Sequence, residues 1–152
     1  MSVSDRLAEL GIELPVVAAP VAAYVPAVVH SGLVYTSGQL PFTKGALPAT
    51  GKVGAEISAE DANAYARTCA LNALAAAADA AGGLDRISGV LRVGGFVAST
   101  PDFSGQPGVI NGASLVLGEI FGEAGTHVRA AVGVPVLPLD SPVEVEVTFI
   151  LA

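Results

Sequence analysis

Residues that bind metals, form disulfides or contact nucleic acid are scarce in this chain. It holds one cysteine, two histidines, no tryptophan and only seven lysine and arginine residues among 152. One cysteine cannot form an internal disulfide, and two histidines without clustered cysteine or aspartate argue against a metal site. The formal charge is −7, and the few basic residues form no stripe that could replace phosphate counterions. We therefore expect no nucleic-acid partner.

Fixed charge is also missing from residues 14–43, a segment long enough to cross a membrane. Four prolines interrupt it, at positions 15, 20, 26 and 41. Because prolines so closely spaced break any helix, the segment predicts strands and turns. The first residues, Met-Ser-Val-Ser-Asp-Arg, lack the apolar stretch of a signal peptide. We therefore expect a cytoplasmic protein with no membrane partner.

Apolar residues, in contrast, make up 52% of the chain. The length of 152 residues fits one domain, spanning residues 1–152, and a domain of that size has a limited interior. Part of the apolar surface is then best buried between copies of the chain, which predicts a homo-oligomer.

The N-terminal half carries the signals of two helices and a β-hairpin. In chain order, the predicted elements are a helix near residues 3–11, hairpin strands at 24–29 and 33–36, an ordered loop at 39–56 and a helix at 58–81. Ser4 and Ser58 are the expected helix caps, and Gly11 and Gly82 are the expected helix stops. The hairpin turn is predicted at His30 and the two residues that follow it.

The C-terminal half repeats the combination of strands and a helix. Its predicted elements are a strand at residues 87–98, a helix at 107–122 and strands at 127–137 and 143–151. Gly94 and Gly95 suggest either a β-bulge or a close approach to the third strand. Two halves of this kind predict an α+β fold, with helices on one face of a mixed sheet.

Arg129 is the one fixed charge between Glu123 and Asp140, within an apolar strand. Because side chains alternate along a strand, Arg129 shares a face with Ala131 and Gly133, whose small side chains leave room beside it. A guanidinium offers two parallel donors that match a carboxylate, so an anion-binding pocket is one interpretation. The other is an edge-strand arginine that reaches water or forms a salt bridge with Glu144 or Glu146.

Other polar positions allow a functional and a purely structural interpretation. Glu144 and Glu146 project from one face of their strand, as a solvated pair or with one carboxylate holding a water. Ser37 and Gly38 follow a strand, where they form a simple turn or bring backbone groups close to a ligand.

Three further residues are more ordinary in their sequence context. Tyr24 favours core packing, and Asn111 favours a surface or capping amide. Cys69, among alanines and leucines in a predicted helix, is expected to be buried and inert.

Several of these segments together resemble the YjgF/RidA family of reactive-intermediate imine deaminases, also known by the older label endoribonuclease L-PSP. The matching segments are Tyr-Val-Pro-Ala-Val from residue 24, Val-Tyr-Thr-Ser-Gly-Gln-Leu-Pro from residue 34, Asn111, Arg129, Leu-Pro from residue 137 and Val-Glu-Val-Glu from residue 143. The resemblance implies a chorismate-mutase-like α+β fold with two helices on one face of the sheet. It also implies a homotrimeric barrel with clefts between its subunits.

The resemblance implies roles for the candidate residues as well. Arg129 matches the arginine that binds the carboxylate of a 2-imino or 2-enamino acid, and Glu144 matches the glutamate that positions the hydrolytic water. The residues implied to line the substrate cleft are Tyr24, Ser37, Gly38, Asn111 and Ala131. No cofactor is needed, and the products are a 2-oxo acid and ammonia. The alternatives are a non-catalytic trimeric module that binds a small carboxylate and an endoribonuclease, which the acidic composition disfavours.

The chain departs from the deaminase pattern beside Arg129. Ala131 stands where many deaminase members have cysteine, and Gly133 stands where many have glutamate. Residues 41–56 and 99–107 also look longer than in short members. These departures reshape the expected cleft and bear on the identity of the substrate more than on the fold.

Overall fold

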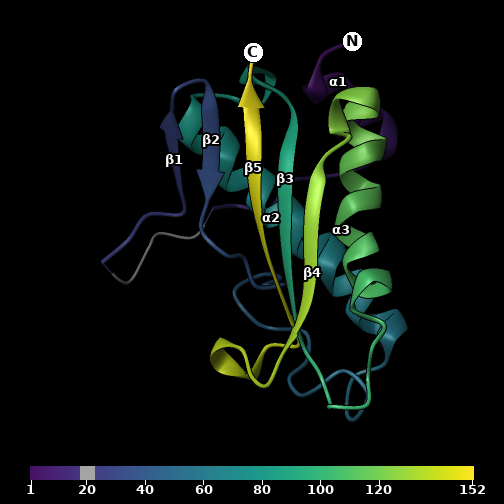
Figure 1. The fold of residues 1–152 in the computed structure, drawn as a ribbon. Coiled ribbons are helices and arrows are strands. Elements are labelled where there is room, and N and C mark those ends of the chain that lie inside the picture. The colour runs from purple at the N-terminus through teal and green to yellow at the C-terminus, as the bar shows by residue number, and fades with distance from the viewer. Residues whose placement is uncertain (18–22) are drawn as a thin grey trace.

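A computed structural model describes residues 1–17 and 23–152 (Figure 1). The helices and strands are α1 (Val3–Leu10), β1 (Ala27–His30), β2 (Leu33–Thr36), α2 (Ala59–Ala81), β3 (Ile87–Ala98), α3 (Gln106–Phe121), β4 (Val128–Val134) and β5 (Val143–Leu151). Residues 18–22 of the charge-free segment lie outside the described residues, and the described part of that segment contains strands and turns, as predicted. Across the described ranges, no helix combines the length and apolar character needed to cross a membrane.

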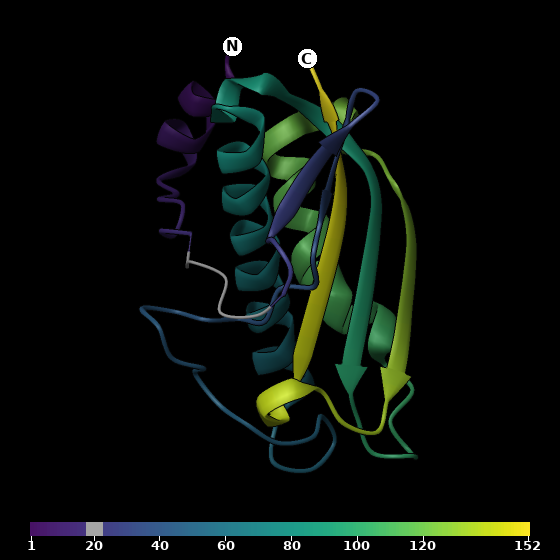
Figure 2. The same ribbon diagram turned by 90° about the vertical axis from the view of Figure 1, so that its left-hand side faces the viewer.

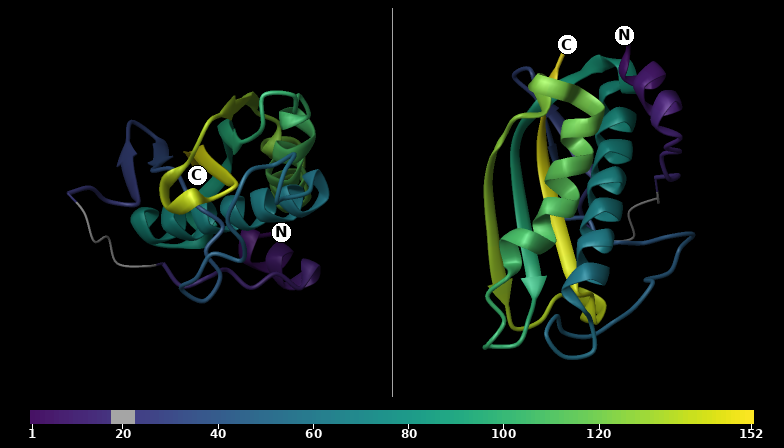
Figure 3. Two further views of the ribbon diagram at one scale, coloured as in Figure 1. Left: turned by 90° about the horizontal axis from the view of Figure 1, so that it is seen from below. Right: turned by 90° about the vertical axis from the view of Figure 1, so that its right-hand side faces the viewer.

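The five strands form one mixed sheet in the order β1-β2-β5-β3-β4. β3 and β4 run parallel, and the other neighbouring pairs are antiparallel. The parallel pair is joined by α3, which packs on one face of the sheet beside α2 (Figure 2). This arrangement confirms the predicted α+β fold with helices on one face of a mixed sheet. α1 lies on the outer side of the helix layer (Figure 3), where the Arg6 Nε atom donates to the Glu119 carbonyl of α3 at 2.9 Å.

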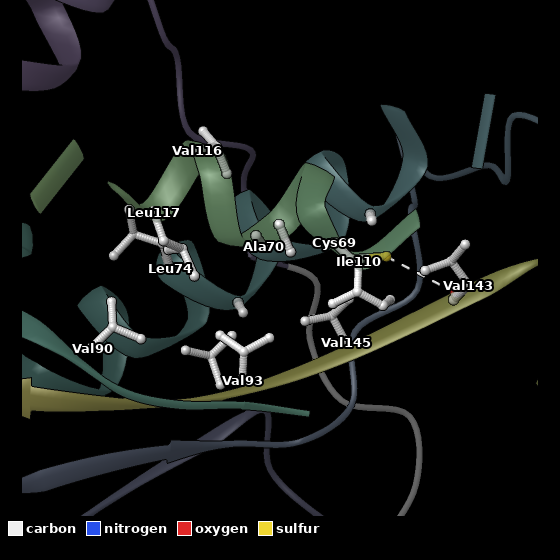
Figure 4. Close-up of a cluster of buried hydrophobic side chains, with 14 of the residues drawn as sticks. Cys69, Ala70, Leu74, Val90, Val93, Ile110, Val116, Leu117, Val143 and Val145 are labelled. Carbon is white, nitrogen blue, oxygen red and sulfur yellow. Dashed lines mark hydrogen bonds between the residues drawn. The ribbon is translucent and has the colours of Figure 1, made fainter. Parts of the chain in front are cut away.

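The core lies between the sheet and the two long helices. β5 alternates in burial from Val143 to Phe149, and its buried side chains point toward α2 and α3. Figure 4 shows where the layers meet, with buried side chains from α2, α3, β3 and β5: Cys69, Leu74, Val93, Ile110, Leu117, Val143 and Val145. The buried face of α2 consists largely of alanines, whose small side chains let the helix approach the sheet closely.

Glycines set the closest approaches in this packing. A Cβ atom at Gly112 of α3 would lie 1.9 Å from the Asn63 carbonyl oxygen of α2, so the two helices cross in near backbone contact. A Cβ atom at Gly95 of β3 would lie 2.5 Å from the Ile110 side chain, so Gly95 serves close packing and not a bulge. The register shifts of β3 occur earlier, between Ile87 and Arg92.

Several boundaries differ from those predicted. The cap of α1 is Ser2 and not Ser4, because the Ser2 hydroxyl accepts from the Asp5 amide while Ser4 donates to Asp85. His30 lies in β1 and not in the turn, and the first hairpin strand begins at Ala27. The predicted strand at 127–137 ends at Val134, because the following proline cannot donate a ladder hydrogen bond.

The sheet face opposite the helices is not covered by any described element (Figure 2). Side chains on this face include the exposed Val28, Tyr35, Val128 and Val132. An apolar face of this kind is typical of a surface that another chain covers.

Candidate functional site

Arg129 lies on β4, the strand at one edge of the sheet, and its side chain runs along α3. The Nη1 atom donates to Asn111 Oδ1 at 2.7 Å and to Ser114 Oγ at 3.2 Å. The Nη2 atom approaches the Pro107 carbonyl oxygen at 3.5 Å. Three acceptors on the first turns of α3 therefore orient an exposed guanidinium, and the fold places Asn111 beside Arg129.

Within the described chain, Arg129 has no carboxylate partner. Glu146, one of the two carboxylates considered for a salt bridge, instead pairs with Arg92 at 3.3 Å. Both Nη1 hydrogens of Arg129 are used, whereas Nε makes no hydrogen bond to any described residue. The Nε and Nη2 atoms form one edge of the guanidinium, and this edge matches a carboxylate in bidentate geometry.

The space beside Gly133 is filled and not open, contrary to the sequence expectation. A Cβ atom there would lie 2.8 Å from Gln106 Nε2 and 3.0 Å from Ser99 Oγ. Gln106, the first residue of α3, donates to Ser99 Oγ at 3.2 Å and to the Phe103 carbonyl at 2.9 Å. Ala131 is half-buried and packs against the core. The departure at Gly133 therefore replaces an expected gap with the Gln106 amide.

A second group of candidate residues lies where β2 ends beside β5. A Cβ atom at Gly38 would lie 2.7 Å from the Glu144 carboxyl carbon, so only glycine lets this carboxylate pack against the backbone. The Ser37 hydroxyl donates to the Val25 carbonyl at 2.7 Å, which ties the segment carrying Tyr24 to the end of β2. The Tyr24 side chain is 60% exposed, so the expectation of core packing is wrong for this residue.

The half-buried Glu144 carboxyl has a raised pKa. Desolvation is the main cause, and repulsion from the Glu146 carboxylate adds to it. A carboxyl group whose pKa rises toward neutral pH is better matched to accept and return a proton. Cys69 is fully buried, and burial raises the pKa of its thiol well above the ordinary value, which confirms the prediction of a buried residue.

The two groups lie on opposite faces of the sheet. Val143, Val145 and Val147 point toward the helices, so Glu144 between them points to the open face. Arg129 points the other way, toward α3. The register places Glu144 beside Phe96 and Arg129 beside Val93. Standard strand spacings then put the Arg129 and Glu144 Cα atoms about 14 Å apart. One chain therefore does not bring the two side chains to the same ligand.

Four polar residues beside the candidate positions on β4 carried no functional signal in the sequence. Ser114 and His127 lie behind Arg129, and Ser99 and Gln106 lie beside Gly133. Each is unremarkable in its own segment, and its relevance depends on how α3 docks against β4. Among the described residues, no group of three or more histidine, cysteine, aspartate or glutamate side chains could hold a metal ion.

Comparisons with known proteins place this geometry in a family. The model of the family described as YjgF/chorismate mutase-like, putative endoribonuclease, matches residues 4–150. Protein TCP17 of Trypanosoma cruzi is 41% identical over 145 residues, covering 95% of this chain and 91% of TCP17.

Solved structures agree with that match. The Agrobacterium tumefaciens protein Atu1372, of unknown function, is 42% identical with a TM-score of 0.90, and the match covers 99% of this chain and 92% of that one. A more distant structure, E. coli TdcF with bound serine, is 25% identical with a TM-score of 0.64, covering 90% of this chain and 94% of TdcF. The chain therefore belongs to the YjgF/RidA family and has its chorismate-mutase-like fold.

Proposed function

We propose that this protein hydrolyses reactive 2-imino and 2-enamino acids to 2-oxo acids and ammonia. Arg129 binds the substrate carboxylate, and Glu144 positions the attacking water. The observation that carries the proposal is the exposed Arg129 guanidinium, which is oriented by Asn111 and has no carboxylate partner among the described residues. TdcF, a distant relative, binds serine, whose carboxylate and adjacent nitrogen resemble those of a 2-imino acid.

The chemistry asks little of the protein beyond positioning. A protonated imine is already electrophilic at carbon, so water adds to the C=N bond while Glu144 accepts a proton from that water. Glu144 returns this proton to the nitrogen of the resulting carbinolamine, and ammonia leaves as the C=O bond forms. The hydroxyl proton released in that step passes by way of Glu144 to the departing ammonia, which leaves as ammonium. A 2-enamino acid first takes a proton on carbon to become the imine. Holding the substrate carboxylate and the attacking water in fixed relative positions supplies much of the rate acceleration, and no cofactor takes part.

Two copies of the chain are needed to complete this site. Arg129 and Glu144 point to opposite faces of the sheet, so a ligand that meets both lies between subunits. The uncovered sheet face, with Val128, Val132 and Tyr35 exposed, offers a surface for such contact. A homotrimeric barrel whose sheets face one another satisfies both requirements.

The proposal is tested with 2-imino acids generated in situ by an amino-acid oxidase or a dehydratase. Addition of the purified protein should accelerate 2-oxo acid release, and Arg129→Ala should abolish that acceleration. Arg86→Ala removes another exposed arginine, from the turn before β3, and this matched control should behave as wild type. Equal rates with wild type, Arg129→Ala and no protein on every imine tried would overturn the proposal.

A second candidate is a non-catalytic module that binds small carboxylates. The Gln106 amide beside Gly133 favours it, because this neutral group stands where many deaminases have a glutamate. This candidate predicts that pyruvate raises the melting temperature in an Arg129-dependent manner while imine hydrolysis stays at the background rate. RNA cleavage, which the family description names, is less favoured by a charge of −7, and a gel assay with nuclease-free protein decides it.

A further inference from the structure

Behind Arg129 lies a chain of hydrogen bonds that the proposed reaction does not use. Ser114 Oγ, which accepts from Arg129 Nη1 at 3.2 Å, also lies 2.9 Å from His127 Nε2. The other ring nitrogen, His127 Nδ1, lies 2.6 Å from the Gly125 carbonyl oxygen. Ser114 and His127 are both part-buried, and they come from α3 and from the residue that precedes β4.

The groups at the two ends of this series of hydrogen bonds, the Gly125 carbonyl and the Arg129 guanidinium, fix the donor and the acceptor of each bond. A carbonyl oxygen only accepts, so His127 Nδ1 carries the hydrogen that it donates to Gly125. In a neutral ring the Nε2 atom is then an acceptor, so the Ser114 hydroxyl donates to it. The guanidinium only donates, and it meets the remaining lone pairs of Ser114. One tautomer of His127 therefore satisfies all three bonds.

We infer that Ser114 and His127 are positioning residues, which fix the Arg129 guanidinium so that its Nε and Nη2 edge faces the carboxylate ligand. Asn111 and Ser114 take both hydrogens of Nη1. With that nitrogen fixed, rotation of the guanidinium plane is blocked. His127 contributes by turning the Ser114 hydroxyl hydrogen away from Arg129, so that a lone pair faces the cation. A preoriented arginine loses less entropy when it binds, and its affinity for a carboxylate rises accordingly.

This inference rests on the proposed function, which supplies the carboxylate ligand. The hydrogen bonds of Ser114 and His127 can nevertheless be tested separately, in the protein without ligand. The chain has two histidines, and exposed His30 on β1 is the internal reference. At about pH 8.5, where histidine side chains are ordinarily neutral, nitrogen NMR should show His127 protonated on Nδ1 and accepting a hydrogen bond on Nε2. In Ser114→Ala the Nε2 resonance should move toward its free value, while His30 stays unchanged. A His127 ring protonated on Nε2 would overturn the inference.

Rotation of the guanidinium is the second readout. In wild type, slow rotation about the Nε–Cζ bond should resolve the Arg129 Nη signals. Ser114→Ala and His127→Phe should both average them, and Ser114→Thr, which keeps the hydroxyl, should restore them. Ser88→Ala is the matched control, because it deletes a hydroxyl bonded to the Ile150 carbonyl at the far end of β3. Unchanged Arg129 signals in both Ser114→Ala and His127→Phe would refute a positioning role.

The functional consequence is measured with pyruvate as probe. Ser114→Ala and His127→Phe should each raise the pyruvate Kd roughly ten- to hundredfold, the loss of about one hydrogen bond to a charged group. In imine hydrolysis they should raise KM and leave kcat nearly unchanged, since Glu144 and its water are untouched. If pyruvate binding and hydrolysis are Arg129-dependent but indifferent to both variants, the positioning inference fails alone. If the NMR signatures hold but Arg129→Ala binds and hydrolyses as wild type does, the proposed function fails instead.

Discussion

Replacing Gly112 by alanine perturbs the tightest contact between α2 and α3. The new Cβ atom would sit 1.9 Å from the Asn63 carbonyl oxygen, whereas real Cβ contacts essentially never fall below 3.0 Å. The neighbouring atom is backbone, so the helices must separate by about 1 Å, which is the strain of an overpacked core. We expect a net loss of about 1–3 kcal/mol in the free energy of unfolding, despite the better helix propensity of alanine.

Gly118→Ala is the matched control on the same helix. Nothing lies within 4 Å of the Cβ position at Gly118, so only helix propensity changes, and the variant should gain up to about 1 kcal/mol. Thermal unfolding at equal protein concentration should therefore separate the variants, since 1 kcal/mol corresponds to about 2–4 °C in a chain of this size. A melting temperature of Gly112→Ala equal to or above that of Gly118→Ala would refute the packing argument.

Three further predictions follow from the site and the core. Native protein should not react with a thiol reagent, because Cys69 is buried with a raised pKa, and it should react fully in denaturant; rapid native reaction would contradict the burial. Glu144→Gln should be inactive yet more stable than wild type. The raised pKa means that wild type loses stability as pH rises above the ordinary value of 4.5 and Glu144 ionises, so the difference in melting temperature should widen between acidic and neutral pH. Finally, co-refolded Arg129→Ala and Glu144→Gln chains should recover up to about a quarter of wild-type activity, since random mixing gives one site in four both intact residues; no recovery would place Arg129 and Glu144 in the same subunit's site.

Much of the fold was predictable because its signals are local and periodic. The alternation of valine and polar residues from Val143 predicted a strand at residues 143–151, and β5 has these bounds. Ser58 and Gly82 gave the ends of α2. The α1 cap was misplaced by two residues because Ser2 and Ser4 both suit a cap, and the decision depends on Asp85, far along the chain.

The candidate site was predictable only in part. Arg129 stood out as an isolated charge, but its hydrogen bond to Asn111 depends on how α3 packs beside β4 and was not predictable from either segment alone. The filling of the Gly133 space by Gln106 was not predictable, because it depends on the angle at which α3 returns to the sheet. The separation of Arg129 from Glu144 depends on the sheet order, which places β3 between β4 and β5 and is not encoded in any single strand.

If the proposed site binds its ligand between subunits, the placement of Arg129 and Glu144 on opposite faces couples ligand binding to self-association. A ligand that requires both residues binds the assembled protein and not the isolated chain, so it stabilises the assembly by mass action. The coupling is reciprocal: whatever factor the ligand contributes to assembly, assembly contributes to ligand affinity. Apparent affinity for the substrate should then fall on dilution, and the concentration of the protein itself becomes a regulator of its activity.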